Sequence, residues 1–295
     1  MTITDSATAE RLRRPGTLRS LRLGALTVTY LPDGGVQLPA RSWLPAATDE
    51  DWAAHPEYLD DAGDLTAGIG ALLVEYGDRT LLIDSGFGPR TVPGQPGLHG
   101  TLQGGALLDS LAEVGRDPAQ IDAVALTHLH PDHVGWAAQP APEGSGPVFT
   151  RAEYLISEPE WTQRELAVPA GTGPEALEVL RRRVRTLRDG EEVLPGVHVR
   201  FALGHTVGHA AYVLTSGEER LIAFGDALHS PVQIGHPEWS AAPDHDPVAS
   251  AEARARLVTE LAQPGTIGYG NHFADVVFGR VRTDGERPTW HPVDA

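Results

Sequence analysis

The sequence predicts an α/β layered protein in which mostly antiparallel sheets are covered by helices. Three observations predict this class. Short apolar or β-branched runs alternate with a few helical segments, hairpin connections outnumber strand–helix–strand crossovers, and no linker, repeat or low-complexity tract divides the chain. With 295 residues, 41% of them hydrophobic, the chain is able to bury a sizeable core. We therefore expect one domain over residues 21–295, after a polar, flexible N-terminus at residues 1–20.

The first third of the chain is expected to hold a strand, an arm and a hairpin. Leu26–Leu31 alternates and is rich in β-branched residues, which is typical of a strand. Residues 32–65 are rich in Pro, Asp and Gly, so we interpret them as an arm that folds over the active site or forms a dimer interface. The Gly77-Asp78 step between apolar runs at 69–76 and 80–83 predicts a β-hairpin.

The rest of the chain alternates between strands and helices. Helical apolar spacing predicts helices at 106–114, at 174–188 with Pro174 in the first turn, and at 247–262 with Asp246 as the N-cap. Apolar runs predict strands at 121–126, 154–157, 197–202, 210–214, 221–224 and 266–270.

Composition excludes several classes of function. The formal net charge of −17 disfavours binding to nucleic acid or to an anionic membrane surface. The absence of cysteine removes disulfides, thiol nucleophiles and thiolate-bound metals. No apolar run approaches the ~20 residues of a membrane span, and residues 1–15 lack a signal-peptide core, so we expect a cytoplasmic protein. Thirteen histidines favour metal chemistry with nitrogen and oxygen ligands.

The strongest motif is Thr127-His128-Leu129-His130-Pro131-Asp132-His133, directly after a predicted strand. Four ligand-type side chains this close together suit a loop, because a helix or strand would spread them over several faces. Imidazole and carboxylate together favour zinc, manganese, iron or cobalt. Further candidates also follow apolar runs, and they are Asp84, His205 with His209, Asp226 and His272.

This order of motifs resembles the metallo-β-lactamase-fold superfamily over about residues 69–280. The resemblance implies a four-layer αββα sandwich of two mixed, mostly antiparallel sheets flanked by helices. It also implies a site for two divalent metal ions, with zinc expected and manganese, iron or cobalt as alternatives. The implied ligands are His128, His130 and His205 for the first ion, Asp132, His133 and His272 for the second, and Asp226 as a bridge. Asp84 and His209 would hydrogen-bond and orient these ligands.

The resemblance further implies a hydrolase in which a metal-bridging hydroxide attacks a small ester-type substrate. Asp132 would orient that hydroxide. The substrate would be a lactone, a carboxylic ester or a phosphotriester, which makes the chain a lactonase, esterase or phosphotriesterase. Redox-active diiron members of the superfamily carry glutamate where this chain has His130, so the site is expected to be hydrolytic.

His229, three residues after Asp226, indicates which branch of the superfamily the chain resembles. Acyl-homoserine-lactone lactonases have a tyrosine at this spacing. The chain therefore resembles the methyl parathion hydrolase and lactonase-like branch more closely, and His229 is a second catalytic candidate that would donate a hydrogen bond to the substrate. Substrate-binding candidates on the loops beside the motifs are Phe87, Trp136, Trp161, Gln233, Trp239 and Phe273.

Other readings remain open at this stage. One is a thioester hydrolase of the glyoxalase-like branch, for which Arg280, Arg282 and Arg287 are the C-terminal basic residues. Another is a non-catalytic metal-binding accessory protein that keeps the fold. A nuclease is disfavoured by the net charge, and a β-lactamase by the expected location. We expect a small-molecule substrate and leave a homodimer open.

Overall fold

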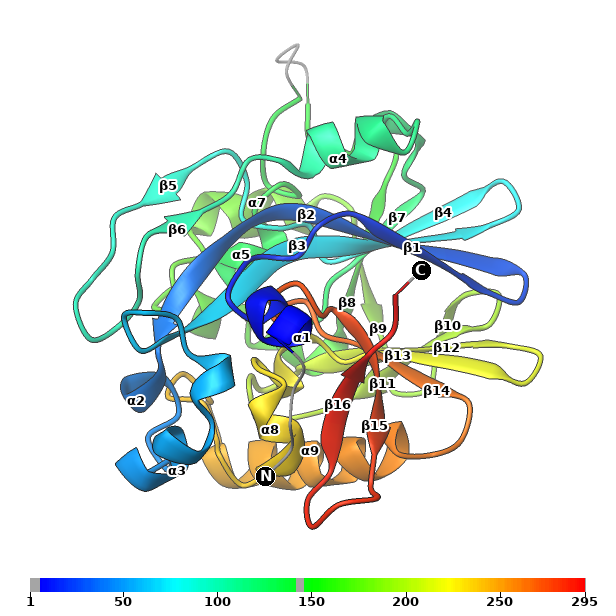
Figure 1. Ribbon diagram of the computed structural model, residues 1–295. Helices are drawn as coiled ribbons and strands as arrows, with labels where there is room; N and C mark the ends of the chain where they lie inside the picture. Colours follow the sequence, from blue (N-terminus) through cyan, green and yellow to red (C-terminus); the bar gives the residue numbers. More distant parts are fainter. Residues whose placement is uncertain (1–5, 142–145, 295) are drawn as a thin grey trace.

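The computed structural model describes residues 6–141 and 146–294 (Figure 1). Among these residues the strands form two sheets. The nine-stranded sheet has the path β5-β6-β2-β3-β4-β7-β8-β9, with β1 beside β2. The seven-stranded sheet runs β10 to β16 in order. Most neighbours are antiparallel, while β4–β7, β7–β8, β8–β9 and β13–β14 are parallel.

The strands of the first sheet are β1 (Arg19–Leu23), β2 (Leu26–Pro39), β3 (Asp64–Tyr76), β4 (Arg79–Ile83), β5 (Thr91–Val92), β6 (Leu102–Gln103), β7 (Ala123–Ala125), β8 (Glu153–Ser157) and β9 (Val184–Leu187). Those of the second sheet are β10 (Glu192–Leu194), β11 (Val197–Phe201), β12 (Ala210–Ser216), β13 (Glu219–Ala223), β14 (Thr266–Tyr269), β15 (Phe278–Arg282) and β16 (Thr289–Pro292).

The α-helices are α1 (Ser6–Arg11), α2 (Ala40–Trp43), α3 (Asp49–Ala54), α4 (Leu107–Glu113), α5 (Pro131–Val134), α6 (Glu158–Thr162), α7 (Pro174–Arg181), α8 (Val232–Gly235) and α9 (Pro247–Leu261). Short 3₁₀ helices are η1 (Pro56–Tyr58), η2 (Pro118–Gln120), η3 (Arg164–Ala167) and η4 (Gly225–Ala227).

Three apolar clusters hold four layers together. The central cluster joins the inner faces of both sheets, for example Val74 and Leu81 of the first with Tyr212 and Leu221 of the second. A second cluster packs α4 and α7 on the outer face of the first sheet. A third packs α9 on the outer face of the second sheet (Figure 1). The predicted αββα sandwich is therefore confirmed, and the hydrophobic burial of both sheet faces explains it.

Several predicted elements are present with small changes in length. The 69–76 and 80–83 hairpin is β3–β4, and Gly77 takes a φ of +61° at its turn. The helix at 106–114 is α4. The helix at 247–262 is α9, and the Asp246 side chain accepts from the N–H groups of Val248 and Ala249 as an N-cap.

Three local predictions were wrong. Residues 32–39 do not belong to the arm, because β2 continues through a bulge at Pro32 and pairs with β3 as far as Pro39. The helix from Pro174 ends at Arg181, and Val184–Leu187 forms β9, which pairs with β8 and buries Leu187 completely. Residues 6–20 are not a flexible end, since they contain α1 and anchor by hydrogen bonds to Asp275. The remainder of that prediction, residues 1–5, lies outside the described residues.

Asp33 of β2 ties the first sheet to two loops and a helix. Its buried carboxylate accepts five N–H groups at 2.7–3.1 Å, from the backbone of Phe87, Gly88, Gly105 and Leu107 and from the indole of Trp136. Such a network satisfies the buried charge without a cation, because each N–H dipole points at it.

Replacing Asp33 tests this network. We expect Asp33→Ala to lower the free energy of unfolding by about 3 kcal/mol, because several buried N–H groups lose their acceptor. Urea unfolding would measure the loss. Asp109→Ala, which removes an exposed carboxylate on α4, serves as the control and should change stability little. Equal stability of the two variants would contradict the role assigned to Asp33.

Candidate metal centre

The predicted ligand residues all follow strand ends, and the sheet topology brings these ends together. Asp84 follows β4, and the His128–His133 motif follows β7. Because β4 and β7 are parallel neighbours, their carboxyl ends share one edge. Asp226 and His272 follow β13 and β14, which are also parallel neighbours. His205 follows β11 of the same sheet.

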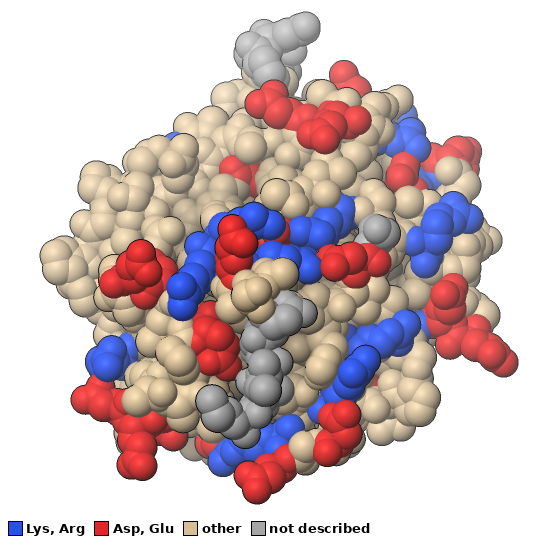
Figure 2. Space-filling view, in the orientation of Figure 1, with Lys and Arg blue, Asp and Glu red and all other residues tan. Residues whose placement is uncertain are grey.

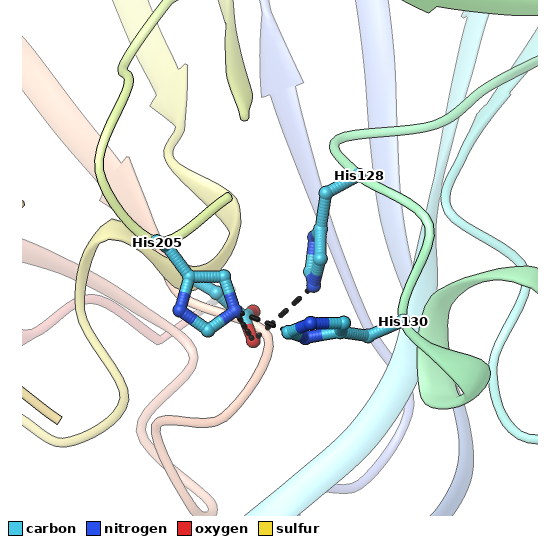
Figure 3. A group of neighbouring side chains, drawn as sticks. His128, His130 and His205 are labelled. Atoms are coloured by element: carbon cyan, nitrogen blue, oxygen red, sulfur yellow. Dashed lines mark hydrogen bonds and ion pairs between the residues drawn. The ribbon is translucent and has the colours of Figure 1, made fainter. Parts of the chain in front are cut away.

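The first group of ligand-type side chains consists of three histidines and one carboxylate. His128, His130 and His205 point toward one another (Figure 3), and Asp226 completes the group. One ligand atom from each lies within 4.8 Å of the others. His130 Nδ1 is 3.1 Å from His205 Nε2, so His130 faces the centre with Nδ1.

The second group lies on the other side of the Asp226 carboxylate. It contains Asp132, His133 and His272, again within 4.8 Å of one another. The Oδ1 atom of Asp226 is 3.2 Å from His133 Nε2 and 3.1 Å from His272 Nε2. Its Oδ2 atom is 3.4 Å from His205 Nε2 and 3.7 Å from His128 Nε2. Each oxygen of Asp226 therefore faces one group.

Hydrogen bonds at the far nitrogen fix the orientation of four imidazoles. Nδ1–H of His133 donates to Asp84 Oδ2 at 2.9 Å, and Nδ1–H of His272 donates to the Gly68 carbonyl at 2.7 Å. Nδ1 of His128 lies 3.0 Å from the Thr127 hydroxyl. The remaining partner, for His205, is Asp244 at 2.9 Å. These bonds leave Nε2 of each ring as the atom that faces the centre.

The donor set fits divalent cations. Nε2 of His128, Nε2 of His133 and Oδ1 of Asp226 are buried and have no hydrogen-bond partner. Burial, together with the neighbouring His205, lowers the pKa of His130 to about 3, and burial also lowers the pKa of His128 well below its usual range. Both rings are therefore neutral at pH 7, which is the form that binds a metal. Histidine and carboxylate ligands in these numbers suit zinc and its first-row neighbours.

Asp84 and His209 lie where the sequence predicted them to support the ligands. Asp84 also accepts from the backbone N–H of Thr127 at 2.8 Å, and its φ of +61° is rare for a residue other than glycine. His209 Nε2 accepts the Asp226 N–H at 2.9 Å. A Cβ on Gly225 would lie 2.7 Å from that same Nε2, so glycine is needed beside it.

A cavity of about 250 Å³ opens over both groups of ligands. Its floor includes His130, Asp132, His205, Asp226 and His272. Apolar side chains dominate its walls, among them Val36, Leu38, Trp43, Ala67, Leu102 and Ala170. None of the described residues that line it is an arginine or a lysine. The predicted arm therefore contributes to this cavity through Trp43, and the extended β2 contributes Val36 and Leu38.

His229 also lines this cavity. Its Nε2 is 3.3 Å from Asp226 Oδ2, and its buried Nδ1 has no hydrogen-bond partner. Its backbone N–H donates to Gln233 Oε1 at 2.7 Å, and its ring makes an edge contact with Trp43. The imidazole is thus held beside the bridging carboxylate.

Comparison with known proteins decides the family. The model of the Metallo-beta-lactamase superfamily matches residues 70–266, more than half of the chain. The chain belongs to this superfamily. The family and the two groups of His and Asp side chains together mark this edge of the sheets as a candidate metal centre.

Similar proteins with this fold differ in what they do. The chain is 35% identical over 164 residues to ribonuclease TTHA0252 of Thermus thermophilus, and the match covers 54% of this chain but only 34% of that protein. It is 24% identical over 202 residues to the N-acyl homoserine lactonase AiiB of Agrobacterium fabrum, which covers 61% of this chain and 70% of the lactonase.

Two solved structures match nearly the whole chain. One is AidC, a dizinc quorum-quenching lactonase, with a TM-score of 0.79, 21% identity, and coverage of 96% of this chain and 99% of AidC. The other is the hydrolase AbOPH, with a TM-score of 0.79, 25% identity, and coverage of 95% and 98%. At 21% identity, the similarity to AidC shows a shared fold and does not show a shared activity.

The six predicted substrate-binding side chains are placed elsewhere in this metallo-β-lactamase fold. None of them is among the described residues that line the cavity. Four of the five aromatic rings are buried in the interior and that of Trp161 is partly buried, because burying such rings stabilises the loops, while the Gln233 side chain is buried as well. The six residues are Phe87, Trp136, Trp161, Gln233, Trp239 and Phe273.

Their contacts show what they do instead. Phe87 and Trp239 belong to the cluster under the arm, and Phe273 packs on Phe224 and Trp290. Trp136 donates to Asp33, and Trp161 lies beneath the Arg164 guanidinium. Gln233 acts on the site indirectly, since it holds the backbone of His229.

The sequence analysis missed Asp244, which orients His205. Asp244 is buried, accepts from His205 Nδ1–H at 2.9 Å, and lies 3.6 Å from the fully buried Arg254. Burial alone would raise the pKa of Asp244, but the hydrogen bond and charge of His205 and the charge of Arg254 bring it to about 2. Its only sequence signal is a polar turn before the N-cap Asp246, which is too common to indicate this role.

Glu160 is a second residue that the sequence analysis missed. Its buried carboxylate accepts from the N–H of Leu129 at 3.0 Å and from the hydroxyl of Thr206 and the N–H of Gly208 at 2.6 and 2.9 Å. It therefore links the loop of His128 and His130 to the loop of His205. It lies in the first turn of α6, a helix that the sequence did not predict.

The role of Asp244 is testable with a matched pair of variants. We expect Asp244→Asn to weaken binding of a cation at the His128, His130 and His205 group by about 10- to 100-fold, because such partners fix the basicity and direction of a ligand histidine. Metal titration in competition with a chelator would measure this. Asp246→Asn is the control, since asparagine also caps α9 and position 246 does not contact His205. Equal affinities in both variants would contradict the assignment.

Proposed function

We propose that this chain is a dinuclear metallohydrolase. Its substrate would be a small, uncharged molecule with an ester-type bond, namely a lactone, a carboxylic ester or a phosphotriester. The observation that carries the proposal is the Asp226 carboxylate, whose two oxygens face two separate groups of ligands at the floor of an apolar cavity. Zinc is the proposed metal, because imidazole and carboxylate ligands suit it and AidC, which shares the fold, is a dizinc enzyme.

His128, His130 and His205 would hold one cation, Asp132, His133 and His272 the other, and Asp226 both. Bound at such a site, two divalent ions provide a hydroxide at neutral pH and polarise the oxygen of the bond under attack. Asp132 lines the cavity with its Oδ2 3.6 Å from His272 Nε2, and its carboxylate would orient the attacking hydroxide. The apolar walls exclude bulk water from the reacting bond.

His229 would orient the substrate. Its Nδ1 has no hydrogen-bond partner, its Nε2 lies 3.3 Å from Asp226 Oδ2, and the residue lines the cavity. An N–H at this position is able to donate to a substrate oxygen beside the cations. This role corresponds to the catalytic residue predicted from the sequence.

The cavity chemistry weighs against the other readings. A thioester of glutathione and a nucleic acid are anionic, and no arginine or lysine lines the cavity among the described residues. Arg280 donates to the Thr266 carbonyl and Arg287 to the Gly235 carbonyl, so neither serves a substrate there. On the face shown in Figure 2, arginines lie beside acidic side chains. These observations support a neutral small-molecule substrate.

Location and assembly stay predictions. No helix among the described residues is long and apolar enough to cross a bilayer. From the sequence we propose a cytoplasmic location and a homodimer.

Metal analysis and a substrate panel test the proposed function. We expect about two metal ions per chain, hydrolysis of at least one neutral lactone, ester or phosphotriester, and loss of turnover after chelation. His128→Ala and Asp226→Ala should lower kcat/KM by on the order of 100-fold or more, because each removes a ligand. His198→Ala, an exposed histidine on β11, is the control. Full turnover in the metal-free protein would refute the proposal.

The role of His229 is tested separately. We expect His229→Phe, which keeps a ring against Trp43, to lower kcat/KM by about 10-fold or more while both metal ions stay bound. Steady-state kinetics and elemental analysis would be measured on the same sample. His99→Phe changes the other cavity histidine that belongs to neither group of ligands and serves as the control. Loss of metal from His229→Phe would instead assign His229 to support of Asp226.

A further inference from the structure

Asp275 is a buried carboxylate three residues beyond His272, in the loop between β14 and β15. Its side chain is fully buried, yet it belongs to neither group of ligands. Arg14 donates to Oδ2 through Nε at 2.9 Å and Nη2 at 2.7 Å. Thr17 donates to Oδ1 through its N–H at 3.1 Å, and Arg19 donates to Oδ1 at 2.5 Å. The carboxylate is thus held by residues from the start of the chain.

The backbone of Asp275 is held by the same segment. Its N–H donates to the Arg11 carbonyl at 3.1 Å, and its carbonyl accepts from Arg11 Nε and Nη2 at 2.9 and 2.6 Å. All four polar atoms of Asp275 therefore bond to residues 11–19. A buried carboxylate is costly without such compensation, so this loop conformation depends on the docked segment.

The loop transmits this restraint to His272. The N–H of Ala274 donates to the His272 carbonyl at 2.9 Å, and Ala274 has a φ of +46°, which is strained for alanine. Gly16 lies directly against the loop, since a Cβ there would be 2.9 Å from the Ala274 carbonyl oxygen. Residues 11–19 thus contact the loop at the Ala274 carbonyl and at Asp275, directly after the strained residue.

The second anchor of His272 lies beside the same segment. The Gly68 carbonyl accepts from His272 Nδ1–H at 2.7 Å, and a Cβ on Gly68 would be 3.5 Å from the backbone nitrogen of Gly16. The segment 11–19 therefore reaches His272 by two indirect routes, through Ala274 to its backbone carbonyl and past Gly68 to the acceptor of its ring. Within the described residues, no ring hydrogen bond of His128, His130 or His205 reaches residues 11–19.

We propose that the segment Arg11–Arg19, through Asp275, is a positioning element for His272 that sets the affinity of the second cation position. The inference rests on the proposed two-cation centre. Asp275 is a positioning residue, not a ligand. The segment affects the cation affinity of the second position only. At the first position, formed by His128, His130 and His205, Asp244 has the corresponding orienting role.

Metal titration of the full-length, metal-free protein tests this positioning role. Zn²⁺ would be added in competition with a chromophoric chelator to wild type, Asp275→Asn and Arg14→Gln. Arg14 is half exposed, so its variant is expected to fold even if Asp275→Asn does not. We expect the weaker of the two equivalents to lose at least 10-fold in affinity in both variants, while the other changes by less than about 3-fold. His272→Ala identifies which equivalent belongs to the second position.

Asp294→Asn is the matched control. Asp294 is exposed and pairs with Arg11 and Arg19 but touches no part of the loop, so both affinities should stay within about 3-fold of wild type. Equal loss at both positions, or no loss in folded Asp275→Asn and Arg14→Gln, overturns the inference and leaves the proposed function intact. Fewer than two equivalents in wild type overturns the proposed function, and this inference with it.

Discussion

The rest of the site depends on one buried carboxylate. Asp226 is almost fully buried, and Oδ1 has no hydrogen-bond donor. Burial alone would raise its pKa, but the surrounding imidazoles, His133 and His272 foremost, hold the pKa well below its usual range. Unlike Asp33, whose oxygens accept five N–H groups, a buried carboxylate with an oxygen that lacks a hydrogen-bond donor needs positive charge beside it. The convergence of strand ends from both sheets on this one side chain provides the place for that charge.

Local sequence motifs predicted which His and Asp side chains gather at the candidate site, because a strand end fixes where the following residues go. The His128–His133 motif contains its own geometry, since Pro131 starts a helix that turns Asp132 and His133 toward the second group. The partners of these ligands were not predictable in the same way. Asp244 and Glu160 act across 39 and 31 positions of sequence separation, and nothing in their own surroundings distinguishes them from a turn residue and a capping residue.

The layers of the fold could be predicted from apolar runs, whereas the cavity wall could not. Aromatic residues beside the motifs were predicted to form the wall. In the structure Trp136 instead donates a hydrogen bond to Asp33, and Phe273 packs on Trp290. Part of the wall comes instead from Val36 and Leu38. They lie in the second half of β2, which continues beyond the bulge at Pro32. The order of residues 6–20 was missed for a related reason. A polar segment is expected to be flexible unless its partner is known, and the partner of Arg14 and Arg19, Asp275, lies far away in the sequence.

The division of the cavity between two parts of the chain has an evolutionary consequence. Val36, Leu38, Trp43, Ala67 and Leu102 supply apolar wall from the first third of the sequence, while the ligand motifs begin only at His128. Substitutions in the wall can therefore change which molecules fit the cavity without disturbing the His and Asp groups at its floor. A lineage built this way can change its ligand range by drift in β2, β3, β6 and the short helix α2, while selection acts on the His and Asp motifs elsewhere in the chain.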